Sequence, residues 1–179
     1  METINDKIMD YLIRNRVSTT EVADCLGKTG ALEGVMPVNR GKYAVGTVKW
    51  IYTYQESNWP MHEQIQDVEE NSVVLFEAFG CGNRALFGEL VSKYLLLYCQ
   101  CRALVVLGNV RDAAGIIRQD YSVWCKGYNP VGCFNERPSE ELDQKLVEAH
   151  RRKYDGAIAV CDDCGVVLIP KSCVTEEFL

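Results

Sequence analysis

The residues best suited to chemistry lie between Phe79 and Asp112 and end in the pair Arg111-Asp112. The planar guanidinium of Arg111 suits a substrate carboxylate, because it can donate two parallel hydrogen bonds. The carboxylate of Asp112 offers the hard oxygen ligands that Mg²⁺ or Mn²⁺ prefers. Neighbouring side chains on a loop point in different directions, so the two can serve different partners. The alternative is structural: the two side chains pair with each other, or they cap a short helix at Ala113.

A glycine-rich segment, Phe79 to Asn83, precedes this pair and leads to Gly88-Glu89-Leu90. These three residues lie either inside a helix that begins at Arg84 or at the true start of a helix, if residues 84–87 are still loop. In the second case the backbone N–H groups around Leu90 and Val91 have no helical partner and can bind a carboxylate or phosphate.

The elements that must position these residues follow from hydrophobic periodicity and turn chemistry. Apolar residues at helical spacing predict an amphipathic helix over 3–14, and Ser18 to Glu21 matches a capping box for a second short helix. β-Branched, aromatic and continuous apolar runs predict strands at 43–54, 72–79, 103–107 and 122–126, with a hairpin at 157–161 and 166–169. Further helices are predicted at 61–68, 84–101, 113–118 and 139–154.

The last of these helices is the most strongly charged segment of the chain. We expect Glu140 and Glu141 in its first turn and the basic run Arg151 to Lys153 in its last turn, which complements the helix dipole. The expected site lies at the carboxyl ends of the predicted strands, where ligands gather in α/β folds.

Length and composition exclude several classes of protein. The chain has 179 residues, 47% hydrophobic and 25% charged, and a formal net charge of −6, so we expect one α/β domain over residues 1–179. Its apolar runs fall short of the roughly 18 residues that span a bilayer. The acidic balance argues against a nucleic-acid partner, because phosphate binding needs a basic surface. The first residues lack a signal-peptide pattern. We therefore expect a soluble protein of the cytoplasm.

The nine cysteines are expected to be reduced thiols, since their number is odd and no secretory pattern is visible. Cys161-x-x-Cys164 has the spacing of a metal knuckle, but the sequence has no second such pair to complete a four-ligand zinc site. Zinc is therefore the minor alternative.

Several segments, taken in order, resemble one known family. Gly82 to Leu90, followed by Ala103 to Asp112, resembles the RraA-like proteins and class II 4-hydroxy-4-methyl-2-oxoglutarate aldolases. The hallmark of that family is an acidic residue well upstream of an Arg-Asp pair, here Glu89 and Arg111-Asp112. The resemblance covers most of residues 18–134 and 155–170.

This resemblance implies a β/β/α sandwich of the swivelling type, assembled as a ring-shaped homotrimer or as a homohexamer, with active sites between subunits. It implies a 2-oxo acid substrate bound on a divalent metal, usually Mg²⁺. Asp112 would be the metal ligand, Glu89 would hold metal-bound water or manage protons, and Arg111 would bind the 2-oxo acid and stabilise the developing enolate. The remaining predicted substrate-binding residues are Gly88, Leu90, Val91 and Asn109.

The implied reaction is retro-aldol cleavage of a 4-hydroxy-2-oxo acid, decarboxylation of oxaloacetate, or both. The chain departs from the family pattern at Leu107, where many relatives have Asp, and in the charged helical insertion at about 138–154. The alternative function is that of a non-catalytic RraA-type regulator, which binds an RNA-degrading endonuclease. Regulators of that type tend to lose the Asp after the Arg, whereas this chain keeps Asp112.

Overall fold

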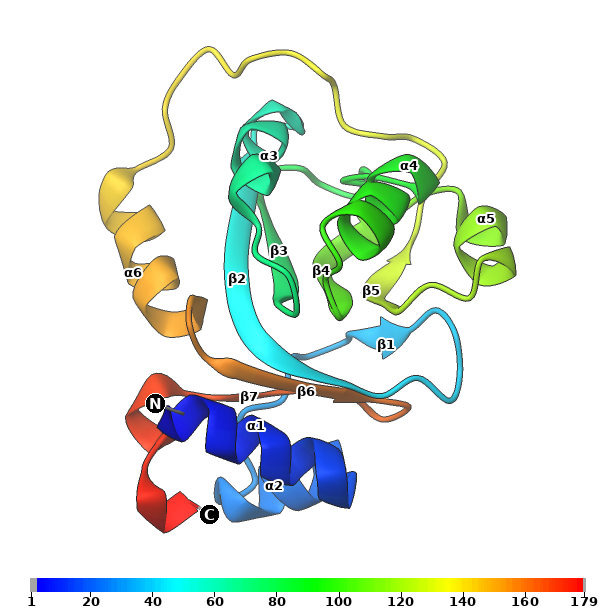
Figure 1. Ribbon diagram of the computed structural model, residues 1–179. Helices are drawn as coiled ribbons and strands as arrows, with labels where there is room; N and C mark the ends of the chain where they lie inside the picture. The colour runs from blue at the N-terminus through cyan, green and yellow to red at the C-terminus, as the bar shows by residue number, and fades with distance from the viewer. Residues whose placement is uncertain (1–2, 179) are drawn as a thin grey trace.

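One mixed sheet of seven strands organises the computed structural model of the protein, which describes residues 3–178 (Figure 1). The strand order is β1-β5-β4-β3-β2-β6-β7, and the pairs within β2-β3-β4-β5 are parallel whereas the other pairs are antiparallel. The strands are β1 (Met36–Pro37), β2 (Ala44–Tyr54), β3 (Val73–Phe79), β4 (Ala103–Val110), β5 (Val123–Tyr128), β6 (Ile158–Asp162) and β7 (Gly165–Ile169).

The long, curved strand β2 joins the two halves of this sheet (Figure 1). Its first part, 44–47, pairs with β6, and its second part, 48–54, pairs with β3. At the bend, a Cβ on Gly46 would lie 2.8 Å from the carbonyl oxygen of Asn71, so only glycine lets the chain pass there. The two edge strands of the sheet are β1 and β7. A bridge between Ala31, which precedes β1, and Val167 of β7 brings these edges toward each other, so the sheet is nearly closed like a barrel.

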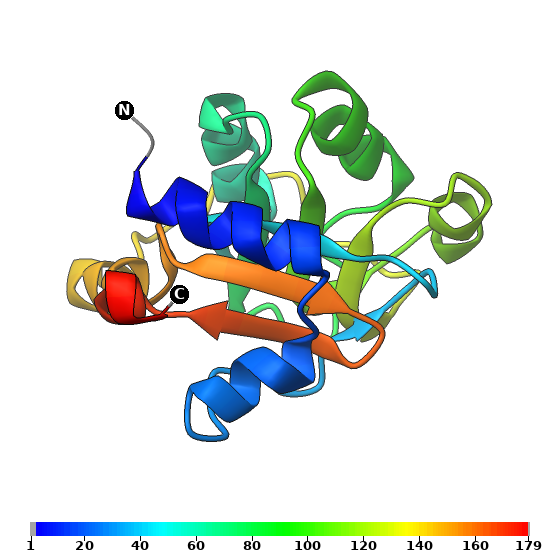
Figure 2. The ribbon, with the colours of Figure 1, turned by 60° about the horizontal axis from the view of Figure 1, so that its bottom comes forward.

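Helices cover the outside of the sheet on both of its halves. Helices α1 (Ile4–Asn15) and α2 (Thr19–Cys25) lie over the β6–β7 hairpin, as Figure 2 shows. Helices α3 (Trp59–Gln64), α4 (Glu89–Lys93) and α5 (Ala113–Arg118) lie on the side of the parallel strands (Figure 1). Helix α6 (Gln144–Tyr154) packs beside β2. A π-helical turn at 94–98 and short 3₁₀ turns at 65–67, 171–173 and 176–178 complete the elements. No helix within residues 3–178 is long and apolar enough to cross a membrane.

Three apolar clusters correspond to these layers. The interior of the sheet is filled from both halves by buried side chains such as Trp50, Leu75 and Trp124. A second cluster, which includes Phe76 and Ile116, lies between the parallel strands and their helices, and a third lies under α1 and α2. Strands β3 and β4 are therefore buried on both faces, which explains their continuous apolar sequence.

The predicted α/β fold class is confirmed, and the two expected β layers are halves of one sheet. The predicted strands and the hairpin are all present, with β1 the one strand of the described chain that the pattern missed. The capping box is confirmed: Ser18 Oγ accepts from the Glu21 N–H (3.2 Å), and the Glu21 carboxylate accepts from the Ser18 N–H (2.8 Å).

Of the two starts predicted for the helix after β3, Arg84 is wrong and the alternative at Gly88-Glu89-Leu90 is confirmed, whereas the predicted start of the last helix at residue 139 is wrong. Residues 84–88 are loop, because Ala85 forms bridges with Asn109 and Gly132, and α4 begins only at Glu89. Helix α6 begins at Gln144, capped by Asp143, so Glu140 and Glu141 precede the helix, whereas the basic run does fall in its last turn. The divergence of segment 138–154 from the family stays a prediction.

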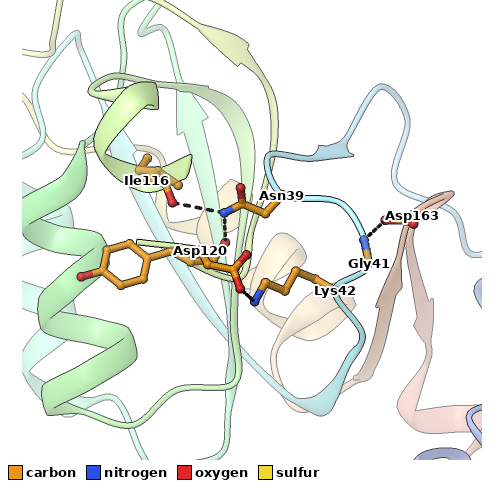
Figure 3. Close-up of polar contacts among 7 residues, drawn as sticks. Asn39, Gly41, Lys42, Ile116, Asp120 and Asp163 are labelled. Atoms are coloured by element: carbon orange, nitrogen blue, oxygen red, sulfur yellow. Dashed lines mark hydrogen bonds and ion pairs between the residues drawn. The ribbon is translucent and has the colours of Figure 1, made fainter. Parts of the chain in front are cut away.

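A polar cluster at the edge of the sheet fixes α5 against the chain before β2. Figure 3 shows Asn39 donating from Nδ2 to the carbonyl oxygens of Ile116 (3.1 Å) and Tyr121 (2.9 Å). Ile116 and Tyr121 are 0% and 6% exposed, so their carbonyl oxygens have little access to water as a substitute for Asn39. Nearby, Lys42 forms an ion pair with the exposed carboxylate of Asp120 (2.5 Å between Nζ and Oδ2).

We expect Asn39→Ala to lower the free energy of unfolding by about 1–3 kcal/mol, because it removes two buried hydrogen bonds of about 0.5–1.5 kcal/mol each. Each carbonyl oxygen keeps one backbone donor, the Tyr121 N–H on Ile116 (3.2 Å) and the Val123 N–H on Tyr121 (3.0 Å). Lys42→Ala is the control, and we expect a loss of about 0–1 kcal/mol because its partner is exposed. Urea denaturation of the three proteins measures both values. Equal losses in the two variants would contradict the assignment of Asn39 as the main anchor.

Candidate functional site

The carboxyl ends of β3 and β4 bring the predicted site residues to one edge of the sheet. Arg111 and Asp112 are the first two residues after β4, whereas Glu89 follows β3 after a loop over residues 80–88. That loop runs against the end of β4: the Leu86 N–H donates to the Asn109 carbonyl (2.9 Å), and the Arg111 N–H donates to the Phe87 carbonyl (2.9 Å). The two strands are parallel, so residues distant in sequence become neighbours here.

Asp112 has a left-handed backbone conformation (φ 57°, ψ 36°), which aspartate tolerates better than most residues. Its main-chain carbonyl accepts from the N–H groups of Gly115 (2.9 Å) and Ile116 (3.1 Å) and so begins α5. Its side chain forms no capping hydrogen bond, which contradicts the capping alternative. Instead, Oδ2 accepts from the Glu89 N–H at 3.3 Å.

The charged groups of the site are close together but weakly paired. Arg111 Nε lies 3.9 Å from Asp112 Oδ2, so these two side chains lie side by side and do not diverge as expected. Arg118 Nη2 lies 3.9 Å from Glu89 Oε1. Both Arg111 and Asp112 are about half exposed, at 50% and 52%. Such pairs contribute about 0–1 kcal/mol, so these groups are available to a ligand.

Each of the three side chains predicted to take part in the chemistry, Glu89, Arg111 and Asp112, lies against a glycine. A Cβ on Gly88 would lie 2.0 Å from Asp112 Oδ2, and one on Gly115 would lie 2.1 Å from Glu89 Oε2. A Cβ on Gly132 would lie 2.7 Å from Arg111 Nη1. A larger residue at any of these positions would have to displace the charged group that it meets.

Sequence reasoning missed Gly115 and Gly132 as parts of the site. A signal for Gly115 was present, because it stands inside the predicted helix 113–118, where glycine costs about 1 kcal/mol relative to alanine. No comparable signal marked Gly132, since glycine in a loop is common.

The remaining predicted residues surround this group. Leu90 and Val91 occupy the first turn of α4. The helical hydrogen bonds of α4 begin with the Ser92 N–H, which donates to the Gly88 carbonyl (3.2 Å), so the N–H groups of Leu90 and Val91 precede the first helical bond. Asn109 lies on β4, not in the expected loop, and its Nδ2 donates to the Asn83 carbonyl (2.7 Å). Its amide therefore holds the glycine-rich loop, and its contact with substrate stays a prediction.

The hard oxygen donors of the site are the carboxylates of Asp112 and Glu89. Mg²⁺ is commonly held by one or two carboxylates together with several waters, so this donor set fits Mg²⁺ or Mn²⁺. Within residues 3–178, no group of three or more His, Cys, Asp or Glu side chains is arranged to hold a metal. A four-ligand zinc site at Cys161 and Cys164 therefore has no support in the described chain.

Comparison with known proteins gives a consistent family and fold. A family model described as RraA-like (Aldolase/RraA) matches residues 19–168. RraAS2 of Streptomyces coelicolor, described as an unusual member of the RNase ES inhibitor RraA protein family, is similar in structure with a TM-score of 0.73 and 20% identity. That match covers 96% of this chain and 89% of the other.

Two further solved structures share the fold at the same low level of identity. The RNA-processing inhibitor RraA from Thermus thermophilis has a TM-score of 0.65 and 19% identity, over 86% of this chain and 93% of that chain. A Geobacillus kaustophilus protein described as S-adenosylmethionine: 2-dimethylmenaquinone methyltransferase has a TM-score of 0.65 and 21% identity, over 87% and 96%. Their different descriptions show that the shared fold does not fix a function.

We expect Gly115→Ala to displace the Glu89 carboxylate while the protein stays folded, because the clash is with the end of a flexible side chain. Alanine stabilises a helix by up to about 1 kcal/mol relative to glycine, so the free energy of unfolding of the variant should equal or exceed that of the original chain. Urea denaturation and a crystal structure of the variant measure the two effects.

The matched control is Ala114→Gly at the neighbouring exposed position of α5. It should lower the free energy of unfolding by about 1 kcal/mol and leave Glu89 in place. An unmoved Glu89 carboxylate in Gly115→Ala would contradict the close packing described here.

Proposed function

The chain belongs to the RraA-like (Aldolase/RraA) family, and from this premise we propose that it is a divalent-metal-dependent lyase acting on a 2-oxo acid. The reaction is retro-aldol cleavage of a 4-hydroxy-2-oxo acid, decarboxylation of oxaloacetate, or both. The observation that carries the proposal is the convergence of Glu89, Arg111 and Asp112 at one sheet edge, each against a glycine.

The demand of this chemistry is electrostatic. Breaking a carbon–carbon bond next to a 2-oxo group leaves an electron pair that moves onto the carbonyl oxygen as an enolate. Positive charge fixed near that oxygen lowers the barrier, because it interacts more strongly with the enolate than with the ketone. Arg111 supplies such a charge, and the adjacent backbone of Gly132 limits where its guanidinium can lie.

Asp112 would hold the divalent metal, with Glu89 beside it. When bound, Mg²⁺ or Mn²⁺ supplies a Lewis acid that polarises the 2-oxo group. The left-handed backbone of Asp112 and the Glu89 N–H orient the carboxylate.

Glu89 manages the protons in this proposal. In retro-aldol cleavage its carboxylate takes the proton from the C4 hydroxyl as the C3–C4 bond breaks, and it then returns a proton to C3 of the enolate. In decarboxylation only the second step is needed. The N–H groups of Leu90 and Val91 bind the substrate carboxylate, and the absence of a side chain at Gly88 lets the Asp112 carboxylate lie beside the start of α4.

We propose further that the chain assembles as a homotrimer or homohexamer. Helix α4 and the π-helical turn expose an apolar patch whose most accessible members are Leu90 (81%), Tyr98 (79%) and Leu97 (58%). A soluble monomer rarely exposes neighbouring large apolar side chains of this kind, so the patch favours an interface.

The second candidate function is that of a regulator which binds an RNA-degrading endonuclease. Its support is that two structural neighbours are described as inhibitors of RNA processing or of an RNase. A binding role of this kind needs an exposed surface but not the Asp112 carboxylate. Loss of that carboxylate therefore distinguishes the two functions.

The test is release of pyruvate from oxaloacetate by purified protein with Mg²⁺ or Mn²⁺, after subtraction of the rate with metal alone. We expect activity that EDTA removes. In Asp112→Asn and in Arg111→Lys we expect kcat/KM to fall by about 100-fold or more. Both changes keep the size of the side chain close to that of the original, so folding should be retained.

The control variants carry the same substitutions far from the site. Asp163→Asn in the β6–β7 turn and Arg14→Lys on α1 should keep the activity of the original chain. Release no faster than with metal alone, from folded protein, would contradict the lyase proposal and favour the regulator.

We expect Leu97→Asp to dissociate the assembly, because a charge in a buried apolar contact must be desolvated without a partner. Light scattering after size exclusion measures the mass. Tyr11→Asp changes an exposed aromatic residue on α1 (50% exposed) and should leave the mass unchanged. A wild-type chain that elutes as a monomer would contradict the assembly.

A further inference from the structure

Two arginines lie against the same glycine beside the candidate site. Arg111 Nη1 lies 2.7 Å from the place that a Cβ on Gly132 would take, and Arg84 Nη1 donates to the Gly132 carbonyl oxygen at 3.0 Å. Gly132 lies in the segment after β5, whereas Arg84 lies in the loop after β3. Nothing in the proposed lyase chemistry uses Arg84.

Three contacts hold the Arg84 guanidinium in place. Besides the Gly132 carbonyl, it meets the Glu56 carboxylate, with 3.2 Å between Nε and Oε1, and its Cζ lies 4.2 Å from the centre of the Phe134 ring. A planar guanidinium can make such contacts together, because its edge donates hydrogen bonds while its face stacks on a ring. The Arg84 side chain is 24% exposed, so it is engaged with the protein and is not open to a ligand.

The turn that carries Glu56 has an unusual backbone. Gln55 and Glu56 both lie in the left-handed region, with φ of 53° and 54°, which residues with a Cβ rarely adopt. The turn nevertheless places the Glu56 carboxylate on Arg84, and the Glu56 carbonyl accepts from the Phe134 N–H (2.8 Å). Strain of this kind persists where surrounding contacts impose it, and it is common beside functional sites.

The segment around Gly132 is also held by its backbone. The Ala85 N–H donates to the Val131 carbonyl, and the Cys133 N–H donates to the Ala85 carbonyl, at 2.9 Å in both cases. These bonds do not involve the Arg84 side chain, so the segment should keep its place without it. What the Arg84 side chain adds is a donor for the Gly132 carbonyl oxygen.

Without Arg84, the Gly132 carbonyl oxygen would have no hydrogen-bond donor from the described part of the chain. The Arg111 guanidinium already lies against this glycine, and its ion pair with Asp112 is long (3.9 Å) and half exposed. Such a pair holds a side chain weakly, whereas a hydrogen bond from a charged donor to a carbonyl is a strong one. Arg111 would therefore turn onto the free carbonyl and lose donors that a ligand needs.

We propose that Arg84 is a positioning residue for Arg111. It occupies the Gly132 carbonyl, where Glu56 and Phe134 hold it, and so keeps the Arg111 guanidinium free to bind the 2-oxo acid. Arg84 itself does not touch the substrate. This role rests on the proposed lyase function, because Arg111 is the residue that Arg84 serves, but the position of Arg111 can be measured without any reaction.

The first test is a crystal structure of Arg84→Ala beside one of the original chain. We expect the Arg111 guanidinium of the variant within hydrogen-bond distance of the Gly132 carbonyl oxygen. An Arg111 side chain that keeps its place, with water on that carbonyl, would overturn the proposal. If the original chain releases no pyruvate, the proposed function fails, and the position of Arg111 in these crystals still decides whether Arg84 controls it.

The second test is pyruvate release from oxaloacetate. We expect kcat/KM to fall by about 10- to 100-fold in Arg84→Ala, the size of loss that a small misplacement of a catalytic group causes. Arg102→Ala is the matched control, because Arg102 Nη1 also donates to a backbone carbonyl, that of Val45 (2.8 Å), but precedes β4 at the end away from the site. It should leave kcat/KM within about 2-fold of the original value. Equal losses in the two variants would overturn the proposal.

A double-mutant cycle shows whether Arg84 acts through Arg111. When Arg84→Ala is added to Arg111→Lys, the guanidinium that Arg84 keeps free is already absent. We therefore expect a further fall in kcat/KM of about 2-fold or less. A further fall as large as that in the original chain would show that Arg84 acts independently of Arg111, and it would overturn the proposal.

Discussion

The close approach of three charged side chains to glycine backbone is the constraint on which the site depends. Asp112 lies against Gly88, and Arg111 lies against Gly132, at distances that no Cβ could share. The glycines leave the space that these carboxylate and guanidinium groups occupy, and the ion pairs between the groups are weak. This leaves their charge available to a ligand, because the pairs that they do form are long and half-exposed.

The sheet supplies the rigidity that such placement needs. Parallel strands β3 and β4, buried on both faces, end at the same edge, and the loop over 80–88 is tied to β4 by backbone hydrogen bonds. Helix α5, which carries Gly115, is held from the other side by Asn39. The strand β2 connects this half to the hairpin half, where α1 and α2 pack. A displacement at any of these supports would move the charged groups relative to one another.

Much of this was predictable from the sequence, for physical reasons that differ between elements. Apolar runs identified the strands because burial on both faces leaves little choice of side chain. The start of α4 was ambiguous, because Arg84 to Gly88 has helical composition but is held in extended bridges by contacts from β4 and from Gly132. Tertiary contacts of this kind leave no local signal. The acidic and basic residues of the site could be recognised from their residue types. The packing of Glu89 on Gly115 could not, because it depends on chain segments that meet only in the fold.

Binding of Mn²⁺, measured by electron paramagnetic resonance, tests most directly whether Asp112 holds the divalent metal. The measurement is made with and without oxalate, which mimics the enolate of a 2-oxo acid. We predict one Mn²⁺ site per chain that binds more tightly in the presence of oxalate. Binding at this site should be lost in Asp112→Asn, weakened in Gly88→Ala and retained in Asp163→Asn. Equal Mn²⁺ binding by the original chain and by Asp112→Asn would contradict it, because Asp112 would then not be the residue that holds the metal.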